Sequence, residues 1–305
     1  MTDKPVTNIA HSVRQRLLNE AKRTGRLYNE IEQYYAIERF LYRLSQSEHS
    51  DKFVLKGALL FTTWHGQRFR ATRDIDLLGR LSNSQEGIAE VFRDVCSQSV
   101  PDDGLIFDPS SVTTAAIAED AEYEGVRVNV DGRLGTGRVR IQVDIGFSDV
   151  IVPESTEIDY PAILDFPSPH LKAYSRESVV AEKLEAMVAL GEGNSRMKDF
   201  ADLWFLSRHF DFEGQLLAEA VRDTFRRRQT PLQTQPTALS PAFARIEAKQ
   251  AQWKAFFHRS SPEGAPADLA EVINAISAFL MPILAHPAAN EPLPRTWEAP
   301  GPWQM

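Results

Sequence analysis

The chain has 305 residues, enough for one large domain or two of ordinary size, each with its own hydrophobic core. Hydrophobic residues make up 43% and charged residues 25%, which excludes a wholly disordered protein. The 34 Lys and Arg against 42 Asp and Glu give a net charge of −8, which excludes a surface that is basic throughout and allows only local basic patches. The one cysteine, Cys96, excludes an internal disulfide and, taken alone, a zinc site.

Membrane and export signals are absent from the sequence pattern. No leader in which basic residues precede an apolar run opens the chain. The most apolar stretch, residues 272–285, contains Asn274, Ser277 and Pro282 and is too short to span a bilayer. We therefore expect a soluble cytoplasmic protein that makes no membrane contact.

The first half of the chain mixes helical and strand patterns. In chain order, the spacing of apolar residues predicts helices at 13–21 and 31–44, a strand at 53–55, a short helix at 58–65, a strand at 74–78, a helix at 85–97, and strands at 126–130 and 139–145. The glycine-rich turn at 131–137 joins the last two strands as a hairpin.

After residues 166–169 every remaining pattern is helical. The helices are expected at about 176–190, 197–209, 212–228, 240–258 and 266–285, with a linker at 229–241. We therefore predict an α+β fold with an α/β lobe and its N-terminal helices at 1–170, a helical lobe at 171–285 and a proline-rich tail at 286–305. The tail is either disordered or docks through its two tryptophans.

Two carboxylates lie in one predicted strand, Asp74-Ile75-Asp76. Because side chains alternate along a strand, Asp74 and Asp76 share a face, with Cα atoms about 6.5 Å apart. Such a pair can bind one or two divalent ions, which would relieve the repulsion between the two charges. The alternative is a strand face that is merely exposed to water.

Asp144 lies on the polar face of its predicted strand. If this strand pairs with that of Asp74 and Asp76, three carboxylates converge, a ligand set suited to two-metal phosphoryl or nucleotidyl transfer. The alternative is that Asp144 forms an ion pair with Arg140 or Arg127.

Lys56 and Gly57 end a strand just before a helix, a position where backbone N–H groups can bind phosphate. The alternative is an ordinary turn glycine.

Lys183 lies inside the apolar stripe of its helix, where a lysine must either reach water or meet an anion. It therefore pairs with Asp199 of the next helix or contacts a nucleotide triphosphate. Lys198 and Asp202, four residues apart, can pair with each other.

Four motifs in this order resemble those of the AbiEii/AbiGii nucleotidyltransferase toxins, a family of the DNA-polymerase-beta-like superfamily that includes the MenT toxins. They are FVLKG at 53–57, RATRDIDL at 70–77, EKLEA at 182–186 and RMKDFADL at 196–203. The resemblance implies a bilobed fold in which a small mixed sheet carries the metal-binding carboxylates and a helical lobe faces it.

The resemblance also implies a reaction: transfer of a nucleoside monophosphate from an NTP, dependent on Mg²⁺ or alternatively Mn²⁺. The expected acceptor is the 3′ end of tRNA, and an AbiEi-type antitoxin is the expected partner. Carried over to this chain, the metal ligands are Asp74, Asp76 and Asp144, and the catalytic set adds Lys183 and Asp199. Nucleotide binding is assigned to Lys56, Gly57, Ala58, Thr72, Arg73, Lys183 and Lys198. Thr72 occupies a hydroxyl position that is phosphorylated in some relatives.

One departure from the superfamily lies at Ala58, where glycine or serine usually follows the first glycine. Alanine keeps the backbone N–H but supplies no hydroxyl to a phosphate.

An RNA acceptor needs a local basic surface, and three arginine groups are candidates: 68, 70 and 73; 133, 138 and 140; and 222 with 226–228. The last group also suits a helix C-terminus without any ligand. Two other functions stay open, transfer to a protein or small molecule and a silent scaffold that binds only an antitoxin or a nucleotide.

Overall fold

Alternating apolar and polar residues build the central hairpin. In the computed structural model, which describes residues 8–66, 69–118, 124–147, 149–289 and 295–304, β5 (Glu124–Leu134) and β6 (Gly137–Phe147) pair as antiparallel strands. Val128, Val130, Ile141 and Val143 are fully buried on one face. The register places Arg127 opposite Asp144 on the other face. The hairpin therefore has one apolar and one polar face.

The chain falls into two compact units. Unit 1 takes in Met1–Gln67, Thr72–Ser148 and Thr156–Ala173, and unit 2 takes in Arg68–Ala71, Asp149–Ser155 and Tyr174–Met305. Unit 2 thus receives two short segments whose neighbours in sequence belong to unit 1.

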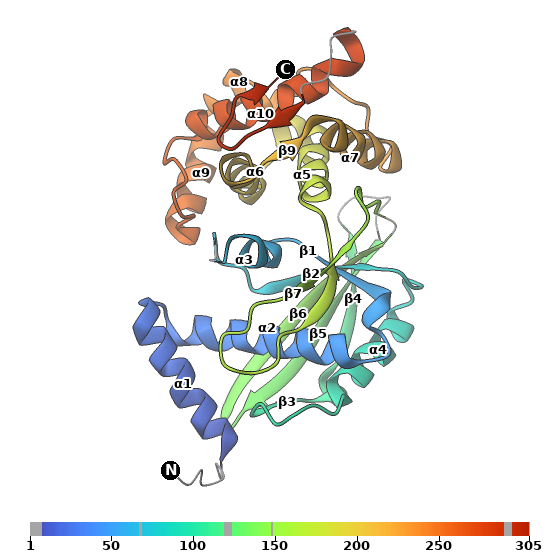
Figure 1. Cartoon of the computed structure of the whole chain (residues 1–305), viewed down its shortest axis with the longest axis vertical. Coiled ribbons are helices and arrows are strands. Elements are labelled where there is room, and N and C mark those ends of the chain that lie inside the picture. The colour runs from blue at the N-terminus through green and yellow to red at the C-terminus, as the bar shows by residue number, and fades with distance from the viewer. Residues whose placement is uncertain (1–7, 67–68, 119–123, 148, 290–294, 305) are drawn as a thin grey trace. The chain divides into compact units, whose positions relative to one another are not determined.

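Unit 1 contains a mixed, curled sheet with the strand order β3-β5-β6-β2-β1-β8-β7, and β4 pairs with β5 (Figure 1). Besides the hairpin, its strands are β1 (Phe53–Lys56), β2 (Asp74–Gly79), β3 (Leu105–Phe107), β4 (Thr113–Ala118), β7 (Thr156–Asp159) and β8 (His170–Ala173). Its helices are α1 (Ile9–Thr24), α2 (Tyr28–Gln46), α3 (Leu59–His65) and α4 (Gln85–Ser97), with short 3₁₀ turns at Ser50–Lys52 and Pro109–Ser111.

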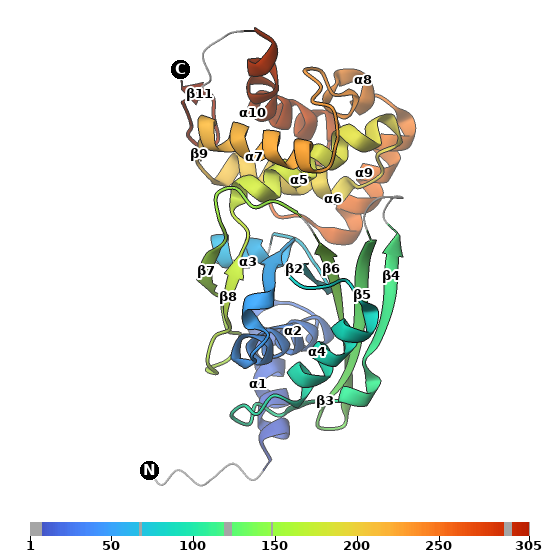
Figure 2. The same ribbon diagram turned by 90° about the vertical axis from the view of Figure 1, so that its right-hand side faces the viewer.

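Helices α2 and α4 pack against the apolar face of this sheet (Figure 2). Phe40 of α2 stacks on Phe92 of α4, with ring centroids 5.8 Å apart, and meets Phe107 of β3 edge-on at 5.2 Å. Phe107 lies opposite Gly132 in the ladder, on the side of Val130. Burying these rings stabilises unit 1. The polar face of the hairpin is the opposite face of the sheet, which these two helices do not cover.

Unit 2 is built mainly of helices. They are α5 (Arg176–Leu190), α6 (Met197–His209), α7 (Gly214–Arg227), α8 (Pro241–Ala244), α9 (Glu247–Ser260) and α10 (Leu269–Ala289), with 3₁₀ turns at Gly191–Gly193 and Thr237–Leu239. Ser175 caps α5 by accepting a hydrogen bond from the N–H of Ser178. Arg228 holds the segment 149–155 in this unit, because its guanidinium lies 3.0 Å from Asp149.

The C-terminal segment forms a three-stranded ribbon with unit 2. β10 (Thr296–Trp297) pairs with β11 (Trp303–Gln304) and with β9 (Phe212–Glu213). Trp297 is buried, and its indole N–H donates to the carbonyl of Ser207 at 2.7 Å. The described residues of the tail therefore dock through the tryptophans, which was one of the two alternatives. Residues 290–294 and 305 lie outside the described part.

The α+β class is confirmed, and the helices expected from periodicity are present. Two expectations were wrong, and four strands were not predicted. Residues after 169 are not all helical, because they include β8 and the ribbon strands. The expected helix at 240–258 is two helices, since the chain turns at Arg245 and Ile246. The sequence did not predict strands β3, β4, β7 and β8, because they are short and their apolar and polar residues do not alternate clearly. Within the described residues, no helix is long and apolar enough to cross a membrane.

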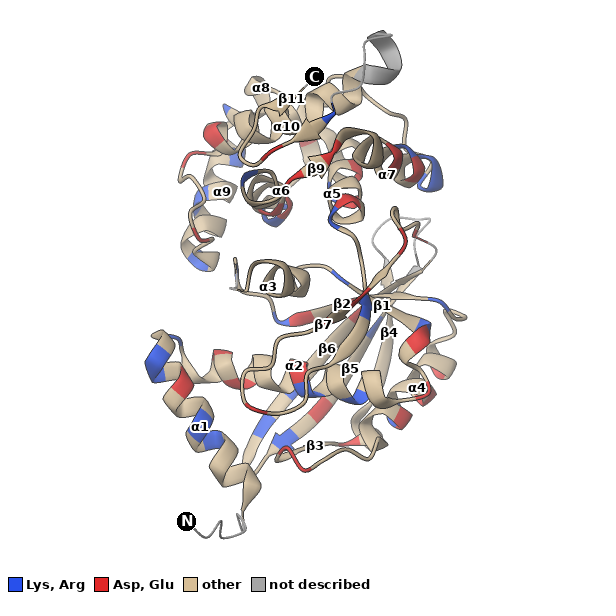
Figure 3. Cartoon of the chain, in the orientation of Figure 1, with Lys and Arg blue, Asp and Glu red and all other residues tan. Residues whose placement is uncertain are grey.

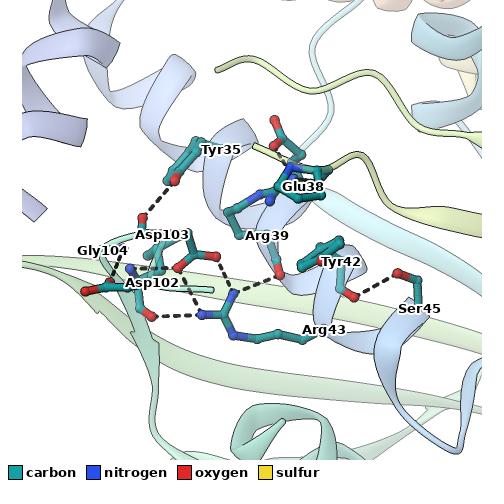
Figure 4. Close-up of polar contacts among 11 residues, drawn as sticks. Tyr35, Glu38, Arg39, Tyr42, Arg43, Ser45, Asp102, Asp103 and Gly104 are labelled. Carbon is teal, nitrogen blue, oxygen red and sulfur yellow. Dashed lines mark hydrogen bonds and ion pairs between the residues drawn. The ribbon is translucent and has the colours of Figure 1, made fainter. Parts of the chain in front are cut away.

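A buried ionic cluster on α2, whose members Glu38, Arg39 and Arg43 are drawn in Figure 4, contacts the loop before β8. Glu38 is fully buried, and its carboxylate lies 2.6 Å from the guanidinium of Arg39. The backbone N–H of Ile163 donates to Glu38 at 2.7 Å, and Arg39 donates to the carbonyl of Pro167 at 2.7 Å. One turn further along, Arg43 forms a bidentate pair with buried Asp103. Burial raises the pKa of Glu38 to about 7, although Arg39 and the Ile163 N–H oppose this rise.

The raised pKa of Glu38 predicts that the protein loses stability as the pH rises from about 5 to about 7. A carboxyl group with a higher pKa in the folded chain binds its proton more tightly there, so its contribution is complete at low pH and lost as the pH passes the folded pKa. The loss in free energy of unfolding should be of order 2–3 kcal/mol. Urea unfolding of the wild type and Glu38→Gln between pH 5 and 8 measures it, and the variant should lack this slope. If the free energy of unfolding depends on pH equally in both proteins, a group other than Glu38 causes that dependence.

Candidate active site

Asp76 and Asp144 lie directly opposite each other on adjacent parallel strands. The register of β2 and β6 pairs Asp76 with Asp144 and Asp74 with Gln142. Since paired residues point to the same side of a sheet, Asp74, Asp76 and Asp144 share the polar face, and Ile75 and Leu77 point to the core. Adjacent strands lie about 4.8 Å apart, so the two opposed carboxylates are near neighbours.

Two cations flank this pair in the same cross-strand row. Lys56 of β1 is opposite Asp76 on one side, and Arg127 of β5 is opposite Asp144 on the other. Arg127 donates two hydrogen bonds of 2.8 Å to the carboxylate of Asp144. The order across four strands is therefore Lys56, Asp76, Asp144, Arg127, in which two negative charges lie between two positive ones.

The Arg127 contact is one of the two alternatives that the sequence left open for Asp144. Arg140, the other candidate partner, is bound to Asp131 instead at 2.7 Å. Asp144 stays 21% exposed beside Arg127, and Gln142 lies 3.4 Å from it. The ion pair thus coexists with placement of Asp144 beside Asp76.

Gly57 makes room for the Asp76 carboxylate. It has a φ of +75°, and a Cβ added here would lie 2.7 Å from Cγ of Asp76, well inside van der Waals contact. Glycine is thus required both by the backbone conformation and by the close approach of the carboxylate. Ala58 follows at the start of α3, which has only seven residues. Thr72 donates its backbone N–H to the hydroxyl of Tyr34 at 2.8 Å, and Arg73 is exposed before β2.

Another group of ligand-type side chains lies close together among the residues that the structure describes. One donor atom each from Glu48, His49 and Asp94 falls within 4.8 Å of the others. His49 is buried, and its Nδ1 lies 2.8 Å from Nζ of Lys52 while Nε2 lies 3.1 Å from Asp94. An ammonium group can only donate, so Nδ1 accepts and Nε2 carries the proton toward Asp94. Both ring nitrogens of His49 are therefore satisfied by Lys52 and Asp94 without an ion.

The second cluster, in unit 2, centres on Lys183 of α5. Its ammonium lies 2.8 Å from Asp199 and 2.7 Å from Asp202, both on α6 and both buried. Arg196 lies 2.8 Å from Asp199, and Arg70 donates two hydrogen bonds, of 2.6 and 2.8 Å, to Asp202. Three cations therefore meet two carboxylates. The ion pair between Lys183 and Asp199, one of the two sequence alternatives, is present.

Burial and charge oppose each other in this cluster. Burial alone would lower the pKa of Lys183, but the charges of Asp199 and Asp202 outweigh it and the pKa is raised. Burial would raise the pKa of Asp199, but Lys183 and Arg196 hold it below its ordinary value. The pKa of Asp202 is lowered to about 2, despite burial, chiefly by Arg70 and then by Lys183. All three groups are therefore charged at neutral pH.

Sequence reasoning missed two residues of this cluster. It paired Asp202 with Lys198, but Asp202 is fully buried and bound to Arg70 and Lys183, whereas Lys198 is exposed. Arg70 was named only as a basic residue beside the carboxylates, and no periodicity links it to a residue 132 positions away. Arg228, named with the arginines of a helix end, is bound to Asp149 and Glu185. Arg68 lies outside the described residues.

The fold is shared with solved structures. The structure is similar to that of MenT4, a nucleotidyltransferase toxin from Mycobacterium tuberculosis H37Rv, with a TM-score of 0.55 and 17% identity over 92% of this chain and 91% of that one. It is also similar to JHP933 from Helicobacter pylori, with a TM-score of 0.47 and 13% identity over 86% of this chain and 94% of that one. The match to MenT4 shows that the chain has the fold of that nucleotidyltransferase toxin.

A sequence profile of the family described as nucleotidyl transferase AbiEii toxin, type IV TA system, matches residues 39–275. The chain belongs to this family and is a nucleotidyltransferase toxin of a type IV toxin–antitoxin system, which implies an antitoxin partner and a nucleotide donor. No curated protein matches the chain.

Gly57→Ala should lower nucleotidyl transfer by about 100-fold, because the new methyl group would displace the Asp76 carboxylate by about 1 Å or more. Gly66→Ala is the matched control. Gly66 also has a positive φ, +71°, but an added Cβ would meet nothing within 4 Å. Both variants lose stability from the strain of a positive φ, and Gly57→Ala loses more because of the clash with Asp76, so urea unfolding checks that each is folded under the assay conditions. Equal activity of the two variants would show that the position of Asp76 does not limit the reaction.

Asp202→Asn should lower the free energy of unfolding by about 3–5 kcal/mol, because it leaves Arg70 and Lys183 short of a buried counter-charge. Asp223→Asn is the control. Asp223 pairs with Arg226 at the surface, so this change should cost less than about 1 kcal/mol. Urea unfolding at pH 7 compares the two, and a small effect of Asp202→Asn would exclude a stabilising role for the cluster.

Proposed function

We propose that the protein transfers a nucleoside monophosphate from an NTP to the 3′ end of tRNA in the cytoplasm, and so blocks aminoacylation and translation. The observation that carries this proposal is the pair of opposed carboxylates Asp76 and Asp144, with Asp74 on the same face, in a chain of the AbiEii family. The proposed partner is an AbiEi-type antitoxin.

The proposed metal is Mg²⁺, with Mn²⁺ as the alternative. Carboxylate oxygens are the ligands that such hard cations prefer, and Asp74, Asp76 and Asp144 would hold the ion. Arg127 occupies both oxygens of Asp144 with one hydrogen bond each, but every carboxylate oxygen has a second lone pair, so the donor set fits. When bound, the ion would neutralise charge on the triphosphate.

The residues around the carboxylates would position the donor. We assign phosphate contacts to Lys56, the backbone N–H groups of Gly57 and Ala58, and the side chains of Thr72 and Arg73, which lie on or beside β1 and β2. In the reaction, the ribose 3′ hydroxyl of the acceptor forms a bond to the α-phosphorus, the bond to the β-phosphate breaks, and pyrophosphate leaves.

Lys183 would contact the triphosphate and Asp199 would be the essential carboxylate of unit 2. Support comes from the charge state of Lys183, whose pKa is raised by Asp199 and Asp202 after burial is overcome. An ammonium group has three N–H donors, and these two carboxylates take two of them. Lys198, exposed on α6, is proposed as a further phosphate contact.

Incubation of the pure protein with each labelled NTP, Mg²⁺ and total tRNA tests the proposal. Label on the 3′ end of tRNA supports it. Label on a protein or a small molecule would show that the acceptor is not tRNA. If no label is transferred although NTP still binds, the protein is a silent scaffold.

Asp74→Asn should lower kcat/KM for this transfer by roughly 10²–10³-fold, since it removes a metal ligand worth several kcal/mol of transition-state stabilisation. The matched control is Asp159→Asn, a change of a 76% exposed carboxylate on β7 of the same sheet. Its rate should equal that of the wild type. Far-UV circular dichroism checks that both variants fold, and a fully active Asp74→Asn protein would exclude the proposed metal set.

A further inference from the structure

Positive charge is concentrated at one end of unit 1. Residues 8–26 contain five Lys or Arg and a single Glu, in a chain whose net charge is −8. Figure 3 shows Lys and Arg along α1 and at the turn end of the β5–β6 hairpin. Such segregation in an acidic protein creates a local field that attracts anions.

Two arginines face each other at this hairpin end. Arg133 of β5 and Arg138 of β6 are directly opposed in the ladder and both exposed. Like charges in this position destabilise a hairpin. Within the described part of the chain neither arginine forms an ion pair, whereas the next arginine, Arg140, is neutralised by Asp131. An anionic ligand would relieve the repulsion between Arg133 and Arg138.

A pocket shares one of its lining residues with the contact to the turn between the two arginines. Arg14 of α1 donates to the hydroxyl of Thr136, in the turn between Arg133 and Arg138, at 3.1 Å. The same Arg14 lines a pocket of about 350 Å³, whose lining residues are His11, Arg14, Gln15, Leu18 and Tyr28. The pocket thus combines an aromatic ring and an aliphatic side chain with hydrogen-bonding and cationic groups.

We propose that this basic tip, defined as the pocket together with Arg133 and Arg138, binds RNA, with phosphates on the arginines and a base against Tyr28. The inference rests on the proposed transfer to RNA. Arg138 and Asp144 lie six residues apart on the same face of β6, which corresponds to about 20 Å. The basic tip would therefore hold the body of the acceptor several nucleotides away from its reacting end.

The composition of the pocket favours RNA over an acidic protein. Proteins bind single-stranded nucleic acid by combining cations along the backbone with aromatic rings on which bases stack. The tip offers both within one short segment, since Tyr28 and Arg14 line the same pocket and Arg14 contacts the turn that joins the two opposed arginines.

The test is direct binding of fluorescein-labelled tRNA by anisotropy, over a range of salt concentrations, with Arg133→Gln/Arg138→Gln. This double variant should bind about 10-fold or more weakly, and the slope of log K against log salt should decrease by about 1.5, because two phosphate contacts are lost. Arg80→Gln/Arg93→Gln is the control of equal charge, since both residues are exposed or partly exposed and Arg80 follows the opposite end of the sheet. It should bind like the wild type.

Tyr28→Ala separates stacking from charge. It should weaken tRNA binding about 5-fold or more while leaving the salt slope unchanged, because no cation is removed. A thermal melt confirms that the variant keeps its fold.

The outcomes separate this inference from the proposed function. If the wild type binds and labels tRNA and the arginine double variant does so equally well, the RNA site lies elsewhere and the function stands. If the wild type neither binds nor labels tRNA, the proposed acceptor is wrong, and this site falls with it. If the double variant keeps tRNA binding but loses the antitoxin, the tip is a protein interface and the inference is overturned.

Discussion

Two carboxylates on adjacent strands can lie side by side only if their repulsion is balanced. In unit 1 the balance is built into the register, which places Lys56 beside Asp76 and Arg127 beside Asp144. The row therefore folds without depending on an ion to neutralise it. A divalent cation and a polyphosphate, when they arrive, would enter a site whose local charge is already compensated on both sides.

In unit 2, buried carboxylates are likewise balanced by neighbouring cations. Asp199 and Asp202 would be costly inside a helical core, and Lys183, Arg196 and Arg70 surround them with charge and hydrogen bonds. Because Arg70 precedes β2 by only a few residues, one contact of this cluster fixes the segment that leads to Asp74 and Asp76 in sequence. The cluster thus joins the segment at Arg70 to α5 and α6 within unit 2.

Much of this arrangement follows from the sequence, because local patterns determine it. The hairpin turn alone sets the register that places Arg127 opposite Asp144. That β2 lies parallel beside β6 depends on contacts between distant segments, which alternation does not encode. For Asp202, helical spacing suggested Lys198, but tertiary burial decided the partner. The short strands β7 and β8 carry too few residues for a period to emerge.

The ribbon at the C-terminus makes the last residues part of the core of unit 2. Phe279 of α10 is covered by Trp297 and Trp303, with centroids at 5.0 and 5.9 Å, and both indole N–H groups donate to backbone carbonyls of α6 and α10. A premature stop codon, or a protease that clips the chain before Thr296, would uncover that ring and create an aggregation-prone surface. A purification handle is accordingly better placed at the N-terminus than beside this ribbon.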